Sequence, residues 1–345
     1  MSAHSQTVIG LDFGSHFIKG VELRENQGHF SLLSLGQIAT PPKGLFSDLP
    51  IDEQVMIDTV IRLIKEMKVS TKLVNTALPE SQVFTRVIEV PRVSDKELSS
   101  ALQWEAEQYI PLPLEEVNLD YAVINENMTD REKMEILLVA APLKLIEKYT
   151  RILESAGLNP ASLETEIIAA ARALSPVMAK DAPTLLMNIG SSMTDIAVVN
   201  NSLINFTRTL SIGGEMIIKS ISQELGFSMV QSEEYIKAYG IEKDKLEGKI
   251  FAAAKTVVDS LIEEVKKTIS YYKEKHNDKE IKSLVLSGGV AKMPGLVFYI
   301  ASEVGLETQI GNPIMSISKD EKIFGKLGAE VVSYSVACGL ALKEI

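Results

Sequence analysis

Apolar residues recur along the chain in a pattern that predicts two sets of three strands. In each set, a first apolar run is followed by an alternating run, as β-hairpins show. Asn26, Gln27 and Gly28 form a typical turn sequence between two predicted strands of the first set. The predicted strands are residues 7–12, 17–24 and 29–37, followed in the second set by residues 184–189, 193–199 and 202–210. The repetition indicates two lobes that share one strand pattern.

Segments with helical periodicity lie between and after these strands. In residues 52–68, for example, Ile57, Val60, Ile61 and Ile64 fall at helical spacing. The other predicted helices are residues 94–109, 143–156, 214–225, 229–239 and 249–274, a helix that starts at 294, and residues 329–343. The other predicted strands are residues 84–90, 119–124, 135–141 and 283–286. Residues 79–159 are therefore predicted to form a compact α+β unit of their own.

Composition and charge narrow the functional classes. The chain has 345 residues, too many for one ordinary core, and its 46% hydrophobic and 23% charged residues are typical of a soluble globular protein. No apolar run reaches the roughly 20 residues of a spanning helix, and no secretory signal is recognisable. The net charge of −11 argues against nonspecific nucleic-acid binding and against adsorption to anionic lipid. The single cysteine, Cys338, is expected to be a buried apolar side chain in a reducing cytoplasm.

The most informative motif is a duplicated turn. Residues 11–15 read Leu-Asp-Phe-Gly-Ser and residues 187–191 read Met-Asn-Ile-Gly-Ser, at the same place in the two strand sets. The glycine of each turn, Gly14 or Gly190, lets the backbone approach a ligand closely. Two unrelated hairpins are the alternative, but the flanking strands match in length and order. We expect two loops that hold one phosphate chain from opposite lobes.

The polar residues near these turns suit a nucleotide with a magnesium ion. Asp12 can hold the water shell of Mg²⁺, an ion that prefers oxygen ligands and keeps several waters. Ser15 and the turn amides can donate hydrogen bonds to phosphate oxygens. Lys19 lies on the next strand and can reach the β- and γ-phosphates as a point charge. The alternative for Lys19 is a solvated lysine on a strand.

Two glycine pairs add to this set. Gly213 and Gly214 stand where a strand passes into a helix, whose N-terminal N–H groups attract phosphate. Gly288 and Gly289 follow an apolar strand, and their flat surface lets an adenine ring lie against the backbone. Each pair alone is weak evidence, whereas four glycine turns in this order are strong evidence for a nucleotide site.

In this order the motifs resemble those of the actin-like ATPase superfamily, which has two ribonuclease-H-like lobes. Residues 12–19 resemble its phosphate-1 motif, residues 188–195 its phosphate-2 motif and residues 286–296 its adenosine motif. Glu166 resembles the acidic residue of the first connecting helix, which helps orient the attacking water, and Gly339 fits the second connecting helix. The implied fold is a two-lobed actin-like α/β fold with an inserted α+β subdomain.

The resemblance also implies the site residues and the cofactors, ATP and Mg²⁺. Glu234 and Lys237 are similar to the Glu-x-x-Lys pair that holds ribose and adenine in the FtsA branch, although an exposed helical ion pair is the alternative. Catalytic roles are implied for Asp12, Glu166 and Asn188, and Asp12 holds the metal through water. The implied nucleotide-binding residues are Gly14, Ser15, Lys19, Gly190, Ser191, Ser192, Gly213, Gly214, Glu234, Lys237, Gly288, Gly289 and Met293.

Further motifs resemble the PilM family, the actin-like components of type IV pilus machines, over essentially the whole chain. They are Val90-Pro91, Glu97-Leu98 and Glu-Ala-Glu-Gln-Tyr-Ile-Pro at residues 105–111. An FtsA protein or a type II secretion GspL domain is less expected, because neither an amphipathic tail nor a spanning helix is seen. The resemblance implies a first lobe of residues 1–78, 160–183 and 329–345, an inserted subdomain of 79–159 and a second lobe of 184–328.

Partners follow from the same resemblance. It implies a cytoplasmic protein recruited to the inner membrane by the N-terminal cytoplasmic tail of PilN, which lies in a groove within residues 79–125. Trp104, Tyr109 and Ile110 fall in this region, where they could equally be core. Other pilus inner-membrane components and the assembly motor ATPases are further implied partners. No nucleic acid is expected, membrane contact is indirect, and a homo-oligomer is left open.

One residue departs from the ATPase pattern. The second phosphate loop of active ATPases begins with aspartate, whereas this chain has Asn188, which carries no negative charge and cannot act as a base. Asp195 is a candidate substitute. We therefore expect ATP binding with at most slow hydrolysis, in a scaffold whose nucleotide state alters partner binding. The alternatives are a polymerising actin-like ATPase and a small-molecule kinase of the same superfamily.

Overall fold

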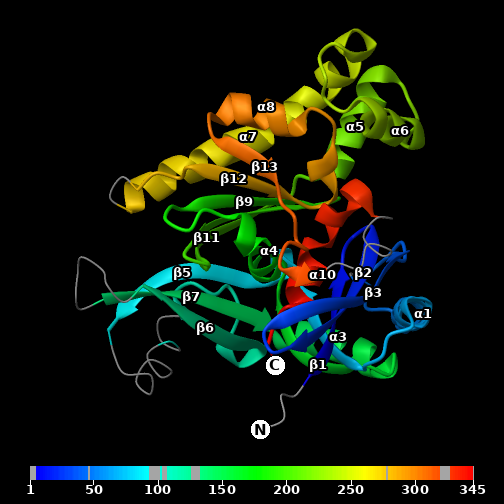
Figure 1. The fold of residues 1–345 in the computed structure, drawn as a ribbon, viewed down its shortest axis with the longest axis vertical. Coiled ribbons are helices and arrows are strands. Elements are labelled where there is room, and N and C mark those ends of the chain that lie inside the picture. The colour runs from blue at the N-terminus through cyan, green and yellow to red at the C-terminus, as the bar shows by residue number, and fades with distance from the viewer. Residues whose placement is uncertain are drawn as a thin grey trace.

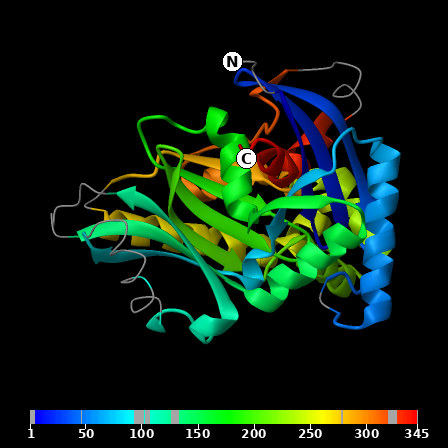
Figure 2. The same ribbon diagram turned by 90° about the horizontal axis from the view of Figure 1, so that it is seen from below.

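The fold of this chain was analysed in a computed structural model. It describes residues 5–45, 47–92, 102, 107–125, 133–276, 279–318 and 327–344. Three β-sheets carry the fold, with helices packed around them (Figures 1 and 2). The two predicted strand sets belong to two different sheets. The strands of the third sheet come, along the chain, between two strands of the first sheet, β4 and β8.

The first sheet contains the N-terminal strand set. Its order is β14-β3-β2-β1-β4-β8, with β1 antiparallel to β2 and parallel to β4. Burial is continuous through the middle of β1 and β2, so side chains on both faces of the sheet are covered there. The strands are β1 (Gln6–Phe13), β2 (Phe17–Asn26), β3 (His29–Ala39), β4 (Leu73–Leu78), β8 (Asn159–Thr165) and β14 (Ile317–Ser318).

The second sheet contains the other strand set, in the order β11-β10-β9-β12-β13. Its first hairpin repeats the register of the first sheet, because Asn188 lies opposite Asp195 just as Asp12 lies opposite Lys19. The predicted duplication is therefore confirmed at the level of paired residues. The strands are β9 (Thr184–Ile189), β10 (Thr194–Asn200), β11 (Leu203–Leu210), β12 (Ser283–Ser287) and β13 (Glu307–Ile310).

The third sheet is small and antiparallel, in the order β5-β7-β6. It consists of β5 (Phe84–Pro91), β6 (Val117–Asn125) and β7 (Lys133–Pro142). A separate hydrophobic core lies on this sheet. It includes Ile88, Ile136 and Leu138 of the strands, together with Leu102 and Ile110. Most of the predicted helix at 94–109 lies outside the described residues.

Helices cover the sheets and connect the lobes. The 27-residue α7 is the longest of the described helices and crosses the second sheet together with α8 (Figure 1). The helices are α1 (Pro50–Met67), α3 (Leu143–Ser155), α4 (Glu166–Leu174), α5 (Gly214–Leu225), α6 (Met229–Tyr239), α7 (Lys249–Lys275), α8 (Leu296–Val304) and α10 (Ser335–Ala341).

The two connecting helices, α4 and α10, meet backbone to backbone. A Cβ atom on Gly339 would lie 1.8 Å from the carbonyl oxygen of Ala169, so only glycine permits this contact. The predicted continuous helix at 329–343 is wrong in its first half, because Gly328–Tyr334 (η6) is a 3₁₀ segment and only α10 is α-helical. The hydroxyl of Ser333 donates to the carbonyl of Glu330, a local bond that competes with regular α-helical bonding.

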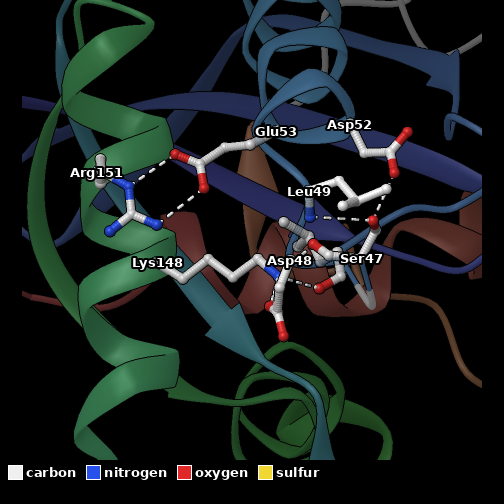
Figure 3. Close-up of polar contacts among 8 residues, drawn as sticks. Ser47, Asp48, Leu49, Asp52, Glu53, Lys148 and Arg151 are labelled. Carbon is white, nitrogen blue, oxygen red and sulfur yellow. Dashed lines mark hydrogen bonds and ion pairs between the residues drawn. The ribbon is translucent and has the colours of Figure 1, made fainter.

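Helix α3 packs against the first sheet and α1 rather than only on its own subdomain. Ile152 and Leu153 share a core with β1 and α1. Arg151 forms a bidentate ion pair with Glu53 of α1, with distances of 2.7 and 2.8 Å (Figure 3). Lys148 donates to the carbonyls of Leu45 and Ser47 and to the Asp48 carboxylate (Figure 3). The C-terminal part of the predicted unit 79–159 is thus tied to the first lobe.

Candidate functional site

A large cavity separates the two strand sets and contains both duplicated turns. Its volume is about 870 Å³, and Gly14 and Gly190 both line it. This volume lies within the roughly 300–1,000 Å³ typical of small-molecule sites. The two turns therefore face one shared space, as the repeated motif predicted.

Most of the predicted site residues line this cavity. Gly213 does not, since it lies behind the second turn, where a Cβ would be 2.4 Å from the carbonyl oxygen of Ser191. The lining residues among those predicted are Asp12, Gly14, Ser15, Lys19, Glu166, Asn188, Gly190, Ser191, Ser192, Gly214, Lys237, Gly288, Gly289 and Met293.

The prediction for Glu234 is not supported by the geometry. Its neighbour Glu233 lines the cavity and pairs with Lys237 at 2.7 Å, whereas Glu234 is exposed and outside the lining. The reason is helical spacing. On α6, Glu233 and Lys237 stand four residues apart on one face with the buried Ile236, and Glu234 is turned one position away from it.

The first hairpin brings Asp12 and Lys19 together. They are paired across β1 and β2, and Asp12 is only 7% exposed. Burial raises the pKa of Asp12 to about 6, against the opposing effect of Lys19. Burial likewise lowers the pKa of Lys19, while Asp12 opposes that shift. Lys19 is therefore a cavity lysine, not the solvated strand residue of the alternative interpretation.

The second hairpin places a carboxylate where the sequence suggested a substitute. Asp195 lies opposite Asn188 in the strand register, lines the cavity and is 3% exposed. Its carboxylate accepts a 2.8 Å hydrogen bond from Thr209. Burial raises the pKa of Asp195 to about 6, and the bonds from Thr209 and Asn188 oppose this. Asn188 thus supports a neighbouring carboxylate instead of supplying one.

Two more carboxyl groups complete the interior of the cleft. Glu166 begins α4, and burial raises its pKa well above the ordinary value, with Asp195, Asp12 and Glu80 adding to the effect. Glu80, which was not predicted from the sequence, also lines the cavity and is 7% exposed. Burial raises the pKa of Glu80 to about 7, and Asp195 adds to it. A signal existed, since a glutamate two residues after the end of a buried strand is unusual, but β4 itself was not predicted.

The start of α5 holds the second turn rather than offering free donors to a phosphate. The amide of Gly214 donates to the carbonyl of Gly190 at 3.0 Å, and the amide of Glu215 donates to Ser191 at 2.9 Å. The expectation that this helix N-terminus presents unpaired N–H groups is therefore wrong for its first two amides. Their role is to fix the turn in position.

Two contacts join the lobes across the cavity. His16 Nδ1 lies 2.8 Å from the Ser191 hydroxyl, which donates at 2.9 Å to the Glu215 carboxylate. On another side, Lys292 pairs with Glu330. Both pairs line the cavity, and neither was predicted from the sequence. A ligand that enters between the turns must therefore meet His16, Ser191 and Glu215.

The residues present fit a magnesium nucleotide. The turns at Gly14 and Gly190 are tight. A Cβ on Gly14 would lie 2.8 Å from the Phe17 carbonyl oxygen, and a Cβ on Gly190 would lie 3.0 Å from the Met193 carbonyl oxygen. Lys19 supplies one cation, and buried carboxylates stand on both lobes. Within the described ranges, no three His, Cys, Asp or Glu side chains converge closely enough to hold an ion directly.

Comparisons with known proteins identify the family of this chain. A family model for the type IV pilus assembly protein PilM matches residues 10–345. The chain belongs to the PilM family. It is 22% identical to the cell division protein FtsA of Neisseria meningitidis over 361 residues, covering 91% of this chain and 85% of that protein.

Solved structures place the PilM-family chain in the actin-like fold. A PilM–PilN type IV pilus biogenesis complex matches with a TM-score of 0.85 and 26% identity, covering 97% of each chain. MreB5 of Spiroplasma citri bound to AMPPNP matches with a TM-score of 0.51 and 14% identity, covering 94% and 97%. The second likeness concerns the fold alone. The predicted two-lobed actin-like fold is confirmed.

The region expected to hold a partner peptide in this PilM-family chain is only partly described. Ile110 is 7% exposed in the core of the third sheet, which favours its interpretation as core. Tyr109 is half-buried, and the Arg86 guanidinium lies 5.0 Å from its ring centroid. Trp104 lies outside the described residues. Among the helices that are described, none combines the length and the apolar character needed to cross a bilayer.

Proposed function

We propose that this PilM-family protein is a cytoplasmic ATP-binding scaffold of the type IV pilus assembly machine. In this role it docks the N-terminal cytoplasmic peptide of a PilN partner and is held at the inner membrane by such partners. The observation that carries the proposal is the shared cavity between Gly14 and Gly190. Membership of the family and the solved PilM–PilN complex support the choice of partner.

In the proposed complex, Asp12 and Asp195 hold the water shell of the magnesium ion from opposite lobes. Lys19 contacts the β- and γ-phosphates, and the amides and hydroxyl groups of the two turns surround the phosphate chain. Gly288 lines the cavity where we place the adenosine. Its φ of 84° and the Ile189 carbonyl oxygen, which a Cβ would approach to 2.3 Å, require glycine at this position. The bound magnesium ion supplies neutralising charge to the phosphates.

Hydrolysis is proposed to be slow. Glu166 is positioned as the group that orients the attacking water. Burial raises its pKa and so favours the protonated form, which cannot accept a proton from that water. Asn188 stands where an ionised residue would help position the metal-bound waters. Loss of one such electrostatic contact typically lowers the rate by about 10²–10³. Binding and slow turnover together suit a scaffold better than a metabolic enzyme.

Nucleotide binding is proposed to change the affinity for the partner peptide. Couplings between two sites usually amount to about 1–3 kcal/mol, or about 5–150-fold. Such coupling requires that ATP bind one arrangement of the lobes better than another. The third sheet, called the inserted sheet below, contacts the second lobe, since the Thr207 hydroxyl of β11 donates to the Thr85 carbonyl of β5 at 3.3 Å. It is joined to the first sheet through the chain, because β5 follows β4 with only a short connection.

Isothermal titration calorimetry with Mg-ATP tests the site. Asp12→Ala and Lys19→Ala are each expected to weaken binding by at least about tenfold, since each removes a charged contact. Asp58→Ala and Lys65→Ala on the exposed face of α1 are matched controls that should bind as the wild type does. If both cleft variants bind as tightly as the wild type, the assignment of the phosphate site is wrong.

A further inference from the structure

Glu80 occupies an unusual position at the entry to the inserted sheet. It starts the short 3₁₀ segment η1 (Glu80–Gln82), which joins β4 of the first sheet to β5 of the third. The residue is 7% exposed and lines the large cavity. The chain therefore enters the inserted subdomain directly from the wall of the candidate nucleotide site.

Buried polar side chains surround this glutamate. Neither carboxyl oxygen of Glu80 forms a hydrogen bond within the part of the chain that the structure describes, and the buried hydroxyls of Thr85 and Thr165 also lack one there. Leaving buried polar groups unpaired is unfavourable, and native structures contain few of them. The Thr85 and Thr165 hydroxyls nevertheless lie close enough to the Glu80 carboxyl group to lower its pKa. The three side chains therefore form one small, loosely bonded polar cluster between the cleft and β5.

On the cleft side, Glu80 lies beside the carboxyl groups of the site. Burial raises its pKa and the charge of Asp195 adds to this effect, while the Thr85 and Thr165 hydroxyls and the Ile167 amide oppose it. Glu166 is affected by Glu80 in turn. The groups around Glu80 therefore come from β10 of the second lobe, from the end of β8 and from the start of α4.

On the other side, Glu80 lies beside the start of β5. Thr85 is the second residue of that strand and pairs with Val139 of β7 in the inserted sheet. The Thr85 carbonyl also accepts the hydroxyl of Thr207 from the second lobe. A shift of Glu80 relative to Asp195 would thus act on the strand that joins the inserted sheet to both lobes.

We propose that Glu80 is a positioning residue that couples the nucleotide cleft to the inserted sheet, through the cleft carboxylates on one side and Thr85 of β5 on the other. This inference rests on the proposed function and assigns it a specific residue. When a nucleotide and its cation occupy the cleft, the charge beside Glu80 changes and its carboxyl group reorients. The start of β5 then moves with it, and the peptide-binding surface changes.

The experiment measures the coupling factor of the full chain. A fluorescent N-terminal PilN peptide is titrated without nucleotide and with saturating Mg-AMPPNP, and the factor is the ratio of the two dissociation constants. Glu80→Met keeps the volume but removes the polar group, whereas Glu80→Gln keeps a polar group. We expect Glu80→Met to reduce the factor to below about 2, and Glu80→Gln to stay within about threefold of the wild type.

Controls separate this inference from a merely structural role. AMPPNP is titrated into each variant first, and the factor is measured at a concentration that saturates that variant, because Glu80 lines the cavity. The melting temperature of Glu80→Met should be at least that of the wild type, because the substitution removes a carboxyl group whose burial is unfavourable. Glu147→Gln, on the exposed side of α3, should keep the wild-type factor. Thr85→Val alters the contact of Glu80 with β5 and leaves the cleft unchanged, so it should lower the coupling factor as well. It tests the inference in place of Glu80→Met if that variant does not fold.

The outcomes distinguish the two proposals. A wild-type factor of one overturns the proposed coupling function and this inference with it. A wild-type factor above about 5 that persists in Glu80→Met and Thr85→Val overturns only the role of Glu80. Loss of the factor in both variants under saturating AMPPNP supports the inference.

Discussion

The substitution Glu80→Gln is expected to change how stability depends on pH. Burial raises the pKa of Glu80 from 4.5 to about 7, so the folded state binds a proton more tightly than the unfolded state does. The stabilising effect of that proton is complete below pH 4.5 and is lost as the pH rises through 7. Unlike an ion-paired carboxylate, Glu80 therefore destabilises the fold at high pH.

The size of the effect follows from the two pKa values. The difference between 7 and 4.5, at about 1.4 kcal/mol per pH unit, corresponds to about 3 kcal/mol of unfolding free energy. The carboxyl group is buried, so solvent screening does not reduce this figure much. Glutamine has nearly the same shape and does not titrate. The variant should therefore exceed the wild type by about 3 kcal/mol at pH 8 and by less than about 1 kcal/mol at pH 5.

Urea unfolding of the nucleotide-free chain at several pH values between 5 and 8 measures this difference. Glu147→Gln is the control, because an exposed carboxylate should leave the wild-type pH dependence unchanged. Asp12 and Asp195 titrate in both proteins, so the difference between the curves reports Glu80 together with its effect on the neighbouring carboxyl groups. Parallel curves for Glu80→Gln and the wild type would refute the reasoning, since they would mean that Glu80 is ionised in the fold at pH 5.

Three further substitutions test other contacts. Glu215→Gln is expected to raise the affinity for Mg-ATP about twofold to fivefold in calorimetry, because it removes a negative charge beside Ser191. Glu224→Gln, at the exposed end of α5, is the control and should leave the affinity unchanged. An unchanged or lower affinity of Glu215→Gln contradicts this. Gly339→Ala is expected to destabilise the fold by about 3 kcal/mol or more, because its Cβ meets the Ala169 carbonyl; an unchanged melting temperature refutes it. Lys148→Met is expected to lower the unfolding free energy by about 1–3 kcal/mol in urea by leaving two carbonyls unpaired, and an unchanged midpoint contradicts it.

The hairpins and long helices could be predicted because their signals are local. Apolar alternation, turn residues and helical spacing all lie within one segment of the chain. Strand β4 was missed for the opposite reason. It carries Asn75 and Thr76 in its centre, and these are buried only because Asn75 donates to the Leu340 carbonyl and Thr76 to that of Leu11. Those partners come from distant parts of the sequence.

The same limit applies to the site. The glycine turns, Asp12 and Lys19 were predictable because the motif itself carries them. Glu80 was not, because its place in the cleft depends on β4. His16 was not singled out either, since its contact with Ser191 joins residues 175 positions apart. The identity of the acidic residue on α6 depended on which helical face turns inward, and this favoured Glu233 over Glu234.

The repeated hairpins differ in charge, and that difference suits one ligand better than two. In the first, Asp12 stands opposite Lys19. In the second, the equivalent positions hold Asn188 and Asp195. The pair of hairpins thus supplies one cation and two carboxylates, one from each lobe. A lysine serves a phosphate chain, and two carboxylates on opposite walls serve the water shell of a divalent cation. A second phosphate-binding lysine at position 195 would leave only Asp12 for the cation. The asymmetry of the duplication therefore favours a single magnesium nucleotide held by both lobes, and with it a site that responds to how the lobes are arranged.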